Sequence, residues 1–78
     1  MRYNLTDLRL FVAVAEASNL TRGAERAHLA PSSASHRLQQ LEGALGTALF
    51  IRRARGVELT RAGEALLRHA RQVFAQLE

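Results

Sequence analysis

The 78-residue sequence contains no cysteine, no lysine and no tryptophan. Without cysteine, neither a disulfide nor a thiolate metal site can stabilise the fold or indicate an oxidising compartment. Its longest uninterrupted apolar run is far too short for the core of a signal peptide or for a membrane span. These absences predict a soluble intracellular protein.

Proline is also scarce, with one residue, and the chain is short. Apolar residues make up 47% and charged residues 23%, a balance typical of globular proteins. The length allows one small domain, and a domain of this size buries only about 60% of the surface of its unfolded chain. Since disulfides and thiolate metal sites are excluded, we expect a second subunit to contribute to stability.

All eleven basic residues are arginines, and they exceed the seven acidic residues by four. Residues 31–55 contain four arginines against Glu42 alone, a net charge of +3. Such a cluster in a small intracellular domain is typical of nucleic-acid binding, and the guanidinium fork suits phosphates and guanine edges. Two alternatives stay open: the cluster is a solvated surface, and the preference for arginine reflects a GC-rich genome.

Apolar spacing predicts two helices in the first 30 residues. The first begins near Asn4 or Thr6 and ends at Ser18-Asn19, and Asn19 caps a short second helix over residues 20–27. Gly23 disfavours that second helix by about 1 kcal/mol relative to alanine. The apolar face of the first helix consists of Leu5, Leu8, Phe11, Val12 and Ala15.

A third helix is predicted to begin at Pro31, where the missing N–H is tolerated, and to end at Gly43 or Gly46. Its inward positions are Ala34, Leu38, Leu41 and Leu45, and its other face carries no acidic residue before Glu42. A short helix, a tight turn and a second helix with a polar N-terminal half predict a helix-turn-helix, whose second helix enters the major groove of DNA. The polar face is Ser32, Ser33, Ser35, His36, Arg37, Gln39 and Gln40.

Two β-prone runs, residues 49–51 and 57–59, enclose a stretch with three arginines and Gly56, which predicts a hairpin. An arginine on such a wing can lie along phosphates or enter a narrow minor groove. We expect Arg55 to do so, with Arg52 and Arg53 beside it. The alternative for Arg52 is that its stem packs on the domain and its guanidinium pairs with a helix carboxylate.

Thr60 is predicted to cap a last helix that runs to the end of the chain. Its apolar stripe extends further than the first helix can cover, so we expect an antiparallel partner helix from a second copy of the chain. Two-fold symmetry would then place two recognition helices on two half-sites. The predicted dimerisation residues are Leu66, Leu67, Ala70, Val73, Phe74 and Leu77.

The order of these elements resembles the N-terminal winged helix-turn-helix of the LysR-type transcriptional regulators. The resemblance covers nearly the whole chain, from about Leu5 to the last helix. It is carried by Leu8-x-x-Phe11-Val12-Ala13-Val14-Ala15-Glu16, Leu20-Thr21-x-x-Ala24, Leu29 through Ser35, Leu38, Leu41-Glu42, Leu45-Gly46-x-x-Leu49-Phe50-x-Arg52 and Leu59-Thr60-x-Ala62-Gly63.

The resemblance implies a mainly α fold with a three-helix core, a two-stranded wing and a long C-terminal dimerisation helix. It divides the chain into a DNA-binding domain, residues 1–60, and a linker helix, residues 61–78. A co-inducer-binding domain normally follows, so we expect this sequence to be a fragment and any small-molecule partner to bind that domain.

As function, the resemblance implies sequence-specific binding of double-stranded DNA by a bacterial transcriptional regulator in the cytoplasm, at the nucleoid. A dimer contacts an inverted repeat, with the recognition helix 31–43 in the major groove and the wing 52–56 toward the minor groove. Pro31, Ser32 and His36 stand where the family commonly has Gln, Pro and Arg, so the preferred bases are not implied. The expected DNA-binding residues are Thr21, Arg22, Pro31, Ser32, Ser33, Ser35, His36, Arg37, Gln40, Arg52, Arg53 and Arg55.

We expect neither an enzyme nor a cofactor or metal. Ser35 and His36 point about 100° apart on a helix, and no carboxylate is placed to orient the imidazole. The histidines lack metal-ligand spacing, and the single glycines form no phosphate loop. The alternative function is a protein-interaction module with little salt-sensitive DNA affinity. For His36, protonation that strengthens DNA binding and a neutral hydrogen-bonding imidazole both stay open.

Overall fold

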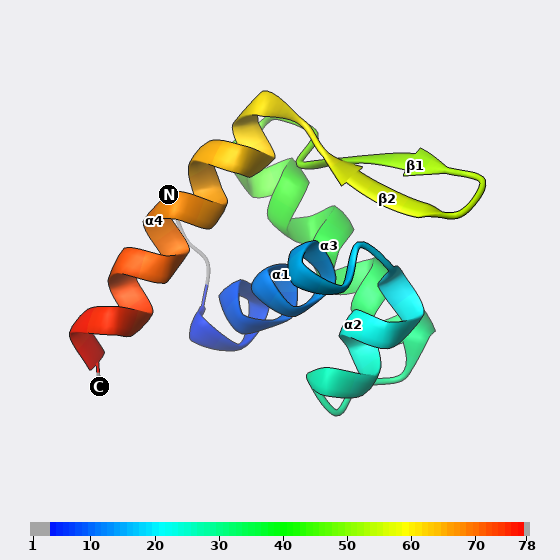
Figure 1. The fold of residues 1–78 in the computed structure, drawn as a ribbon, viewed down its shortest axis with the longest axis horizontal. Helices are drawn as coiled ribbons and strands as arrows, with labels where there is room; N and C mark the ends of the chain where they lie inside the picture. The colour runs from blue at the N-terminus through cyan, green and yellow to red at the C-terminus, as the bar shows by residue number, and fades with distance from the viewer. Residues whose placement is uncertain (1–3, 78) are drawn as a thin grey trace.

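The computed structural model describes residues 4–77. Three helices form a bundle, a two-stranded hairpin projects from it, and a long fourth helix lies across the opposite side (Figure 1). The sequence-based prediction of a mainly α, winged helix-turn-helix fold is confirmed. The elements are α1 (Leu5–Ala17), α2 (Leu20–Arg26), α3 (Pro31–Leu45), β1 (Phe50–Arg53), β2 (Gly56–Leu59) and α4 (Arg61–Leu77).

Helix α1 lies at the centre of the fold and contacts the other three helices. Asn4 caps it by accepting a 2.8 Å hydrogen bond from the N–H of Asp7, and Ser18 ends it in the left-handed conformation. The predicted apolar face was wrong in part, since Leu5 is 45% exposed whereas Leu10 is completely buried. A central helix is covered on more than one side, so its buried arc is wider than a single stripe.

Helix α2 packs closely on α1. Asn19 accepts a 2.9 Å hydrogen bond from the N–H of Arg22, as predicted for an N-cap, and the helix ends at Arg26, one residue earlier than predicted. A side chain at Gly23 would overlap the backbone of Val14. Glycine is therefore required in the middle of α2 by this close approach, which outweighs its low helix propensity.

The turn into α3 contains His28 in a left-handed conformation, with φ of 60°. Pro31 begins α3, as predicted, and Gly46 with φ of 71° ends it, so the helix continues past Gly43 to Leu45. The predicted inward residues Ala34, Leu38 and Leu41 are buried, and Leu45 is half-buried.

The hairpin is antiparallel, with Phe50 opposite Leu59 and Arg53 opposite Gly56. Its strands extend further toward the tip than predicted. Arg52 and Arg53 therefore belong to β1, and only Ala54 and Arg55 form the turn. The base of the wing packs on the bundle, where the ring of Phe50 lies 5.2 Å from that of Phe11.

Helix α4 begins after Thr60, whose hydroxyl oxygen accepts a 3.0 Å hydrogen bond from the N–H of Gly63, as predicted for a cap. Two of the predicted dimerisation residues are not available to a second subunit. Leu66 and Ala70 are buried in the core of this chain, because α4 packs against α1. Among the described residues, no helix is long and apolar enough to cross a membrane.

The far end of α4 is covered less completely. Val73 and Phe74 are half-buried, and the guanidinium carbon of Arg9 lies 4.6 Å from the centre of the Phe74 ring. Helix α1 thus reaches further along α4 than the sequence suggested. Leu77, the last residue of α4, remains 58% exposed to solvent.

Candidate nucleic-acid interface

The N-terminal half of α3 presents its polar side chains to solvent. Pro31, Ser32, Ser33 and His36 are exposed, and Ser35 is half-buried. Ala30, at the N-cap, supplies no side-chain hydrogen bond, so the first N–H groups of α3 have no acceptor from a capping side chain. This end of the helix combines hydroxyl groups, an imidazole and the positive end of the helix dipole, all of which suit phosphates and base edges.

Two further sets of predicted residues flank this half of α3. Thr21 and Arg22 lie exposed in the first turn of α2, and Gln40 is exposed further along α3. In the wing, Nη2 of Arg52 donates a 3.3 Å hydrogen bond to Oγ of Ser35. This side-chain contact connects β1 to α3. The partner of Arg52 is a hydroxyl, not the helix carboxylate of the alternative interpretation.

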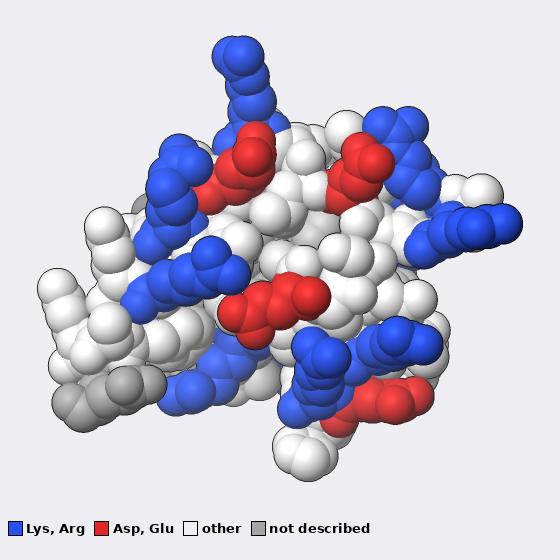
Figure 2. Space-filling model, in the orientation of Figure 1, with Lys and Arg blue, Asp and Glu red and all other residues white. Residues whose placement is uncertain are grey.

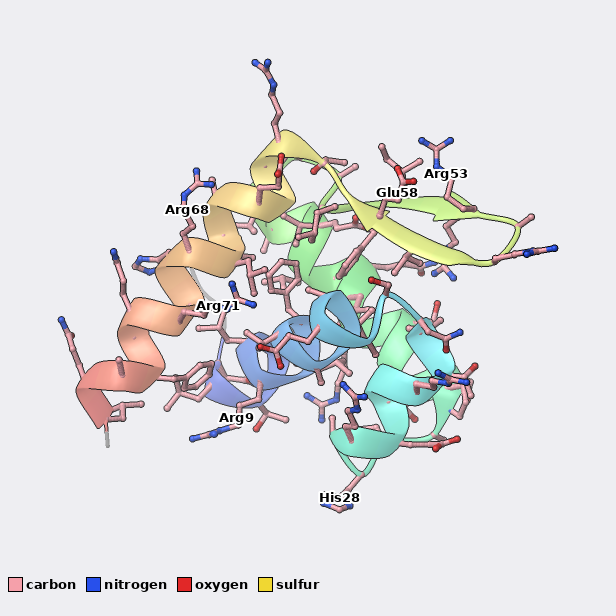
Figure 3. The ribbon with its side chains drawn as sticks, in the orientation of Figure 1. Arg9, His28, Arg53, Glu58, Arg68 and Arg71 are labelled. Atoms are coloured by element: carbon pink, nitrogen blue, oxygen red, sulfur yellow. The ribbon has the colours of Figure 1, made fainter. Side chains whose placement is uncertain are left out.

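The other two wing arginines differ in their surroundings. Arg53 pairs with Glu58 across the hairpin at 3.1 Å, and both side chains are largely exposed (Figure 3). Arg55 lies exposed in the turn at the tip. Because exposed ion pairs contribute little, Arg53 could exchange Glu58 for a phosphate at small cost.

Arg37 lies differently from the other predicted interface residues. Its Nη1 donates to Oδ1 of Asp7 at 2.9 Å, which joins α3 to α1. Its guanidinium is thus held at the start of α1, while 38% of the Arg37 side chain stays exposed. The sequence pattern could not show this, because Asp7 is thirty residues away.

Positive charge is not confined to the surface formed by α3 and the wing. In Figure 2, arginines project from the wing, from α2 and from α4, with acidic side chains between them. On α4, Arg61 and Arg68 are exposed, and Arg71 pairs with Glu16 at 3.4 Å. Charge alone therefore does not select the interface. In residues 4–77, no cluster of three histidine, aspartate or glutamate side chains could hold a metal ion.

One structurally important residue was missed by the sequence analysis. Oε2 of Glu42 accepts hydrogen bonds from the N–H groups of Leu49, at 2.7 Å, and Phe50, at 3.3 Å. The sequence showed an isolated acidic residue near the end of a polar helix face. The sequence could not show its hydrogen-bond partners, because these are the backbone N–H groups of Leu49 and Phe50, which follow α3 in the chain.

A three-helix bundle with a short helix, a turn, an exposed polar helix and a hairpin beside it defines a winged helix-turn-helix protein. The pattern of one family, described as "Bacterial regulatory helix-turn-helix protein, lysR family", matches residues 5–64. The chain belongs to this family, which confirms the resemblance inferred from the sequence.

Individual curated relatives are transcriptional regulators as well. The chain is 45% identical over 74 residues to the Hca operon transcriptional activator HcaR of Escherichia coli K12, covering 95% of this chain and 25% of HcaR. It is 43% identical over 74 residues to the HTH-type transcriptional regulator TfdT of Cupriavidus pinatubonensis, covering 95% of this chain and 32% of TfdT. The chain thus spans about a quarter to a third of the length of these curated relatives.

Solved structures give the same fold. The CbnR DNA-binding domain in its DNA complex superposes with a TM-score of 0.90 at 39% identity, covering 96% of this chain and 86% of that chain. The BenM DNA-binding domain in complex with catB site 1 DNA superposes with a TM-score of 0.91 at 32% identity, covering 96% and 83%.

Proposed function

We propose that this chain binds double-stranded DNA sequence-specifically, as the DNA-binding part of a bacterial transcriptional regulator. The observation that carries the proposal is the hydrogen bond between Arg52 and Ser35, which connects the wing to the exposed half of α3. One surface then offers a helix for the major groove and an arginine-tipped hairpin for the adjacent minor groove. The DNA complexes of the CbnR and BenM domains support this function.

Each part of the surface has its own role in the proposal. The exposed side chains of Ser32, Ser33 and His36 contact base edges from the start of α3, together with Pro31 and the hydroxyl of Ser35. Thr21 and Arg22 contact phosphate beside them, and Arg55 enters the minor groove. Gln40, Arg52 and Arg53 border this surface. Arg37 joins α3 to α1 through Asp7, and because 38% of its side chain is exposed it stays a DNA contact in this proposal.

The proposal includes a homodimer through α4. The side chains still available to a partner are Leu77, which is exposed, and Leu67, Val73 and Phe74, which are half-buried. Leu66 and Ala70 are not available, because the protomer buries them. Two-fold pairing would place two copies of α3 on an inverted repeat.

The proposal extends to the whole protein. We assign residues 1–60 to the DNA-binding domain and residues 61–78 to the linker and dimerisation helix. Since the chain spans a quarter to a third of its relatives, a co-inducer-binding domain would complete the protein, which acts at the nucleoid. No catalytic role is proposed, because the named relatives are regulators and Ser35 is bound by an arginine, not by a histidine.

Selection of bound duplexes from a randomised pool, at moderate salt, tests the proposal. The expected result is an enriched inverted repeat, whose spacing gives the separation of the two recognition helices. Retention of DNA without an enriched motif would contradict sequence-specific contact and leave electrostatic binding only. Absence of bound DNA would favour a protein-interaction module.

A further inference from the structure

Two side chains hold the connection between α3 and the wing: the hydroxyl of Thr60 donates a 2.7 Å hydrogen bond to the carbonyl oxygen of Ala48, and Glu42 binds the loop from α3. After Gly46 the backbone reverses, and Oε2 of Glu42 accepts the N–H groups of Leu49 and Phe50 at the start of β1. The backbone carbonyl of Glu42 also accepts the N–H groups of Gly46, at 2.8 Å, and Thr47, at 3.2 Å. One residue of α3 thus binds both ends of the connecting loop.

The hydrogen bonds from Leu49 and Phe50 to the Glu42 carboxylate are stronger than ordinary loop hydrogen bonds. A carboxylate that accepts N–H groups forms charge-assisted hydrogen bonds, which exceed neutral ones in strength. Leu49 is 1% exposed, so water could not readily replace the acceptor of its N–H if Glu42 were lost. The half-buried Glu42 side chain is directed to the loop, so it has a structural role that does not depend on a contact to DNA.

A second contact fixes β1 further along α3. Ser35 lies seven residues, about two helical turns, before Glu42, and it accepts the hydrogen bond from Arg52. Strand β1 is therefore connected to α3 at two points, near Glu42 and at Ser35.

We propose that Glu42 is a positioning residue for DNA binding, which fixes the wing relative to α3 so that Arg55 meets the minor groove while α3 occupies the major groove. This inference rests on the proposed function. The length of the side chain is the essential property, because its oxygen must reach the N–H of Leu49. The negative charge strengthens these hydrogen bonds, but an amide oxygen of the same reach can also accept both N–H groups.

The first test measures wing position without DNA. Because the chain has no cysteine, Gln40→Cys and Ala54→Cys introduce one spin label on α3 and one at the wing tip. Glu42→Asp keeps the charge but is one methylene too short, whereas Glu42→Gln keeps the length without the charge. Glu42→Asp should broaden the distribution of distances between the two spin labels, and Glu42→Gln should leave that distribution narrow.

The matched control is Glu25→Gln, since Glu25 is exposed on α2 and in no ion pair within residues 4–77. An equally narrow distribution in Glu42→Asp would overturn the inference.

The second test couples Glu42 to DNA binding in a double-mutant cycle, with helix content checked by circular dichroism. In the parent, Arg55→Ala should weaken binding about tenfold. In Glu42→Asp, the same substitution should weaken binding less than about threefold, because β1 has lost its attachment to α3 through Glu42 and the wing tip is less precisely positioned. The base preference of α3 should persist in Glu42→Asp.

The two proposals fail in different ways in this cycle. An equal effect of Arg55→Ala in both backgrounds would overturn the role of Glu42 and leave the proposed function intact. No effect of Arg55→Ala in the parent would contradict the DNA-binding role of the wing, and the inference would fall with it.

Discussion

The backbone N–H of Val57 donates a 3.0 Å hydrogen bond to the carbonyl oxygen of Ser18. This bond joins β2 to the turn between α1 and α2, on the opposite strand from the contacts to α3. Gly56 beside it has φ of 138°, and a side chain there would overlap the Ser18 carbonyl. The two strands of the wing are therefore fixed to two different parts of the bundle, which makes the wing an integral part of the fold.

Gly56→Ala should detach β2 from the Ser18 turn, because alanine neither fits beside the carbonyl nor adopts this backbone conformation. DNA affinity should fall by about tenfold, the expected loss of the wing arginine contact. Helix content should be retained. Fluorescence anisotropy titration and circular dichroism measure the two quantities. Unchanged affinity would show that the wing does not need this attachment.

Gly23→Ala should destabilise the protein although alanine favours helix, because the added methyl overlaps the backbone of Val14. We expect the free energy of unfolding to fall by about 1–3 kcal/mol, as for overpacked cores. Gly43→Ala is the matched control, since no atom lies within 4 Å of its added methyl. That control should raise stability by up to about 1 kcal/mol. Urea unfolding measures the free energy of unfolding of both variants. A change of the same sign in both would contradict the packing argument.

His28→Gly should stabilise the turn between α2 and α3. Histidine is held there with φ of 60°, a conformation that disfavours residues with a side chain by about 1–2 kcal/mol. The greater freedom of glycine in the unfolded chain offsets part of the gain. Thermal unfolding should show a higher midpoint. His69→Gly, at an exposed site within α4, should lower the midpoint instead.

Leu77→Asp and Leu66→Ala should separate dimerisation from folding. Leu77 is 58% exposed, so a charge there should weaken self-association without lowering the stability of the protomer. Leu66 belongs to the core, and Leu66→Ala should reduce the free energy of unfolding by about 2–5 kcal/mol. Sedimentation velocity and urea unfolding give the two measurements. Unchanged association of Leu77→Asp would contradict a dimer through the end of α4.

Arg55→Ala should weaken DNA binding at every sequence. It should also reduce the slope of the logarithm of affinity against the logarithm of salt concentration by about one, because one contact to the phosphate-rich groove is lost. Arg68→Ala removes the same charge from α4, away from the proposed interface, and should change the slope less. Titrations at four salt concentrations supply both slopes. Equal changes in the two variants would show that net charge, not the wing, determines affinity.

Local signals in the sequence determined the elements of this protein. Side chains that cap their own helix, Asn19 and Thr60, could be identified because their partners lie three residues away. Pro31 fixed the start of α3 for the same reason: its effect is on its own backbone. The helix-turn-helix, the wing and the family resemblance followed from such short-range features and from apolar periodicity.

The tertiary structure alone decided which side chains are free to contact a partner. The ion pair of Arg37 with Asp7 and the hydrogen bonds of Glu42 to Leu49 and Phe50 join segments whose register no local pattern specifies. Burial of Leu66 and Ala70 likewise depends on the packing of α4 against α1, two helices that lie far apart in the sequence. Periodicity shows that a face is apolar, but only the packing of the elements shows what covers it.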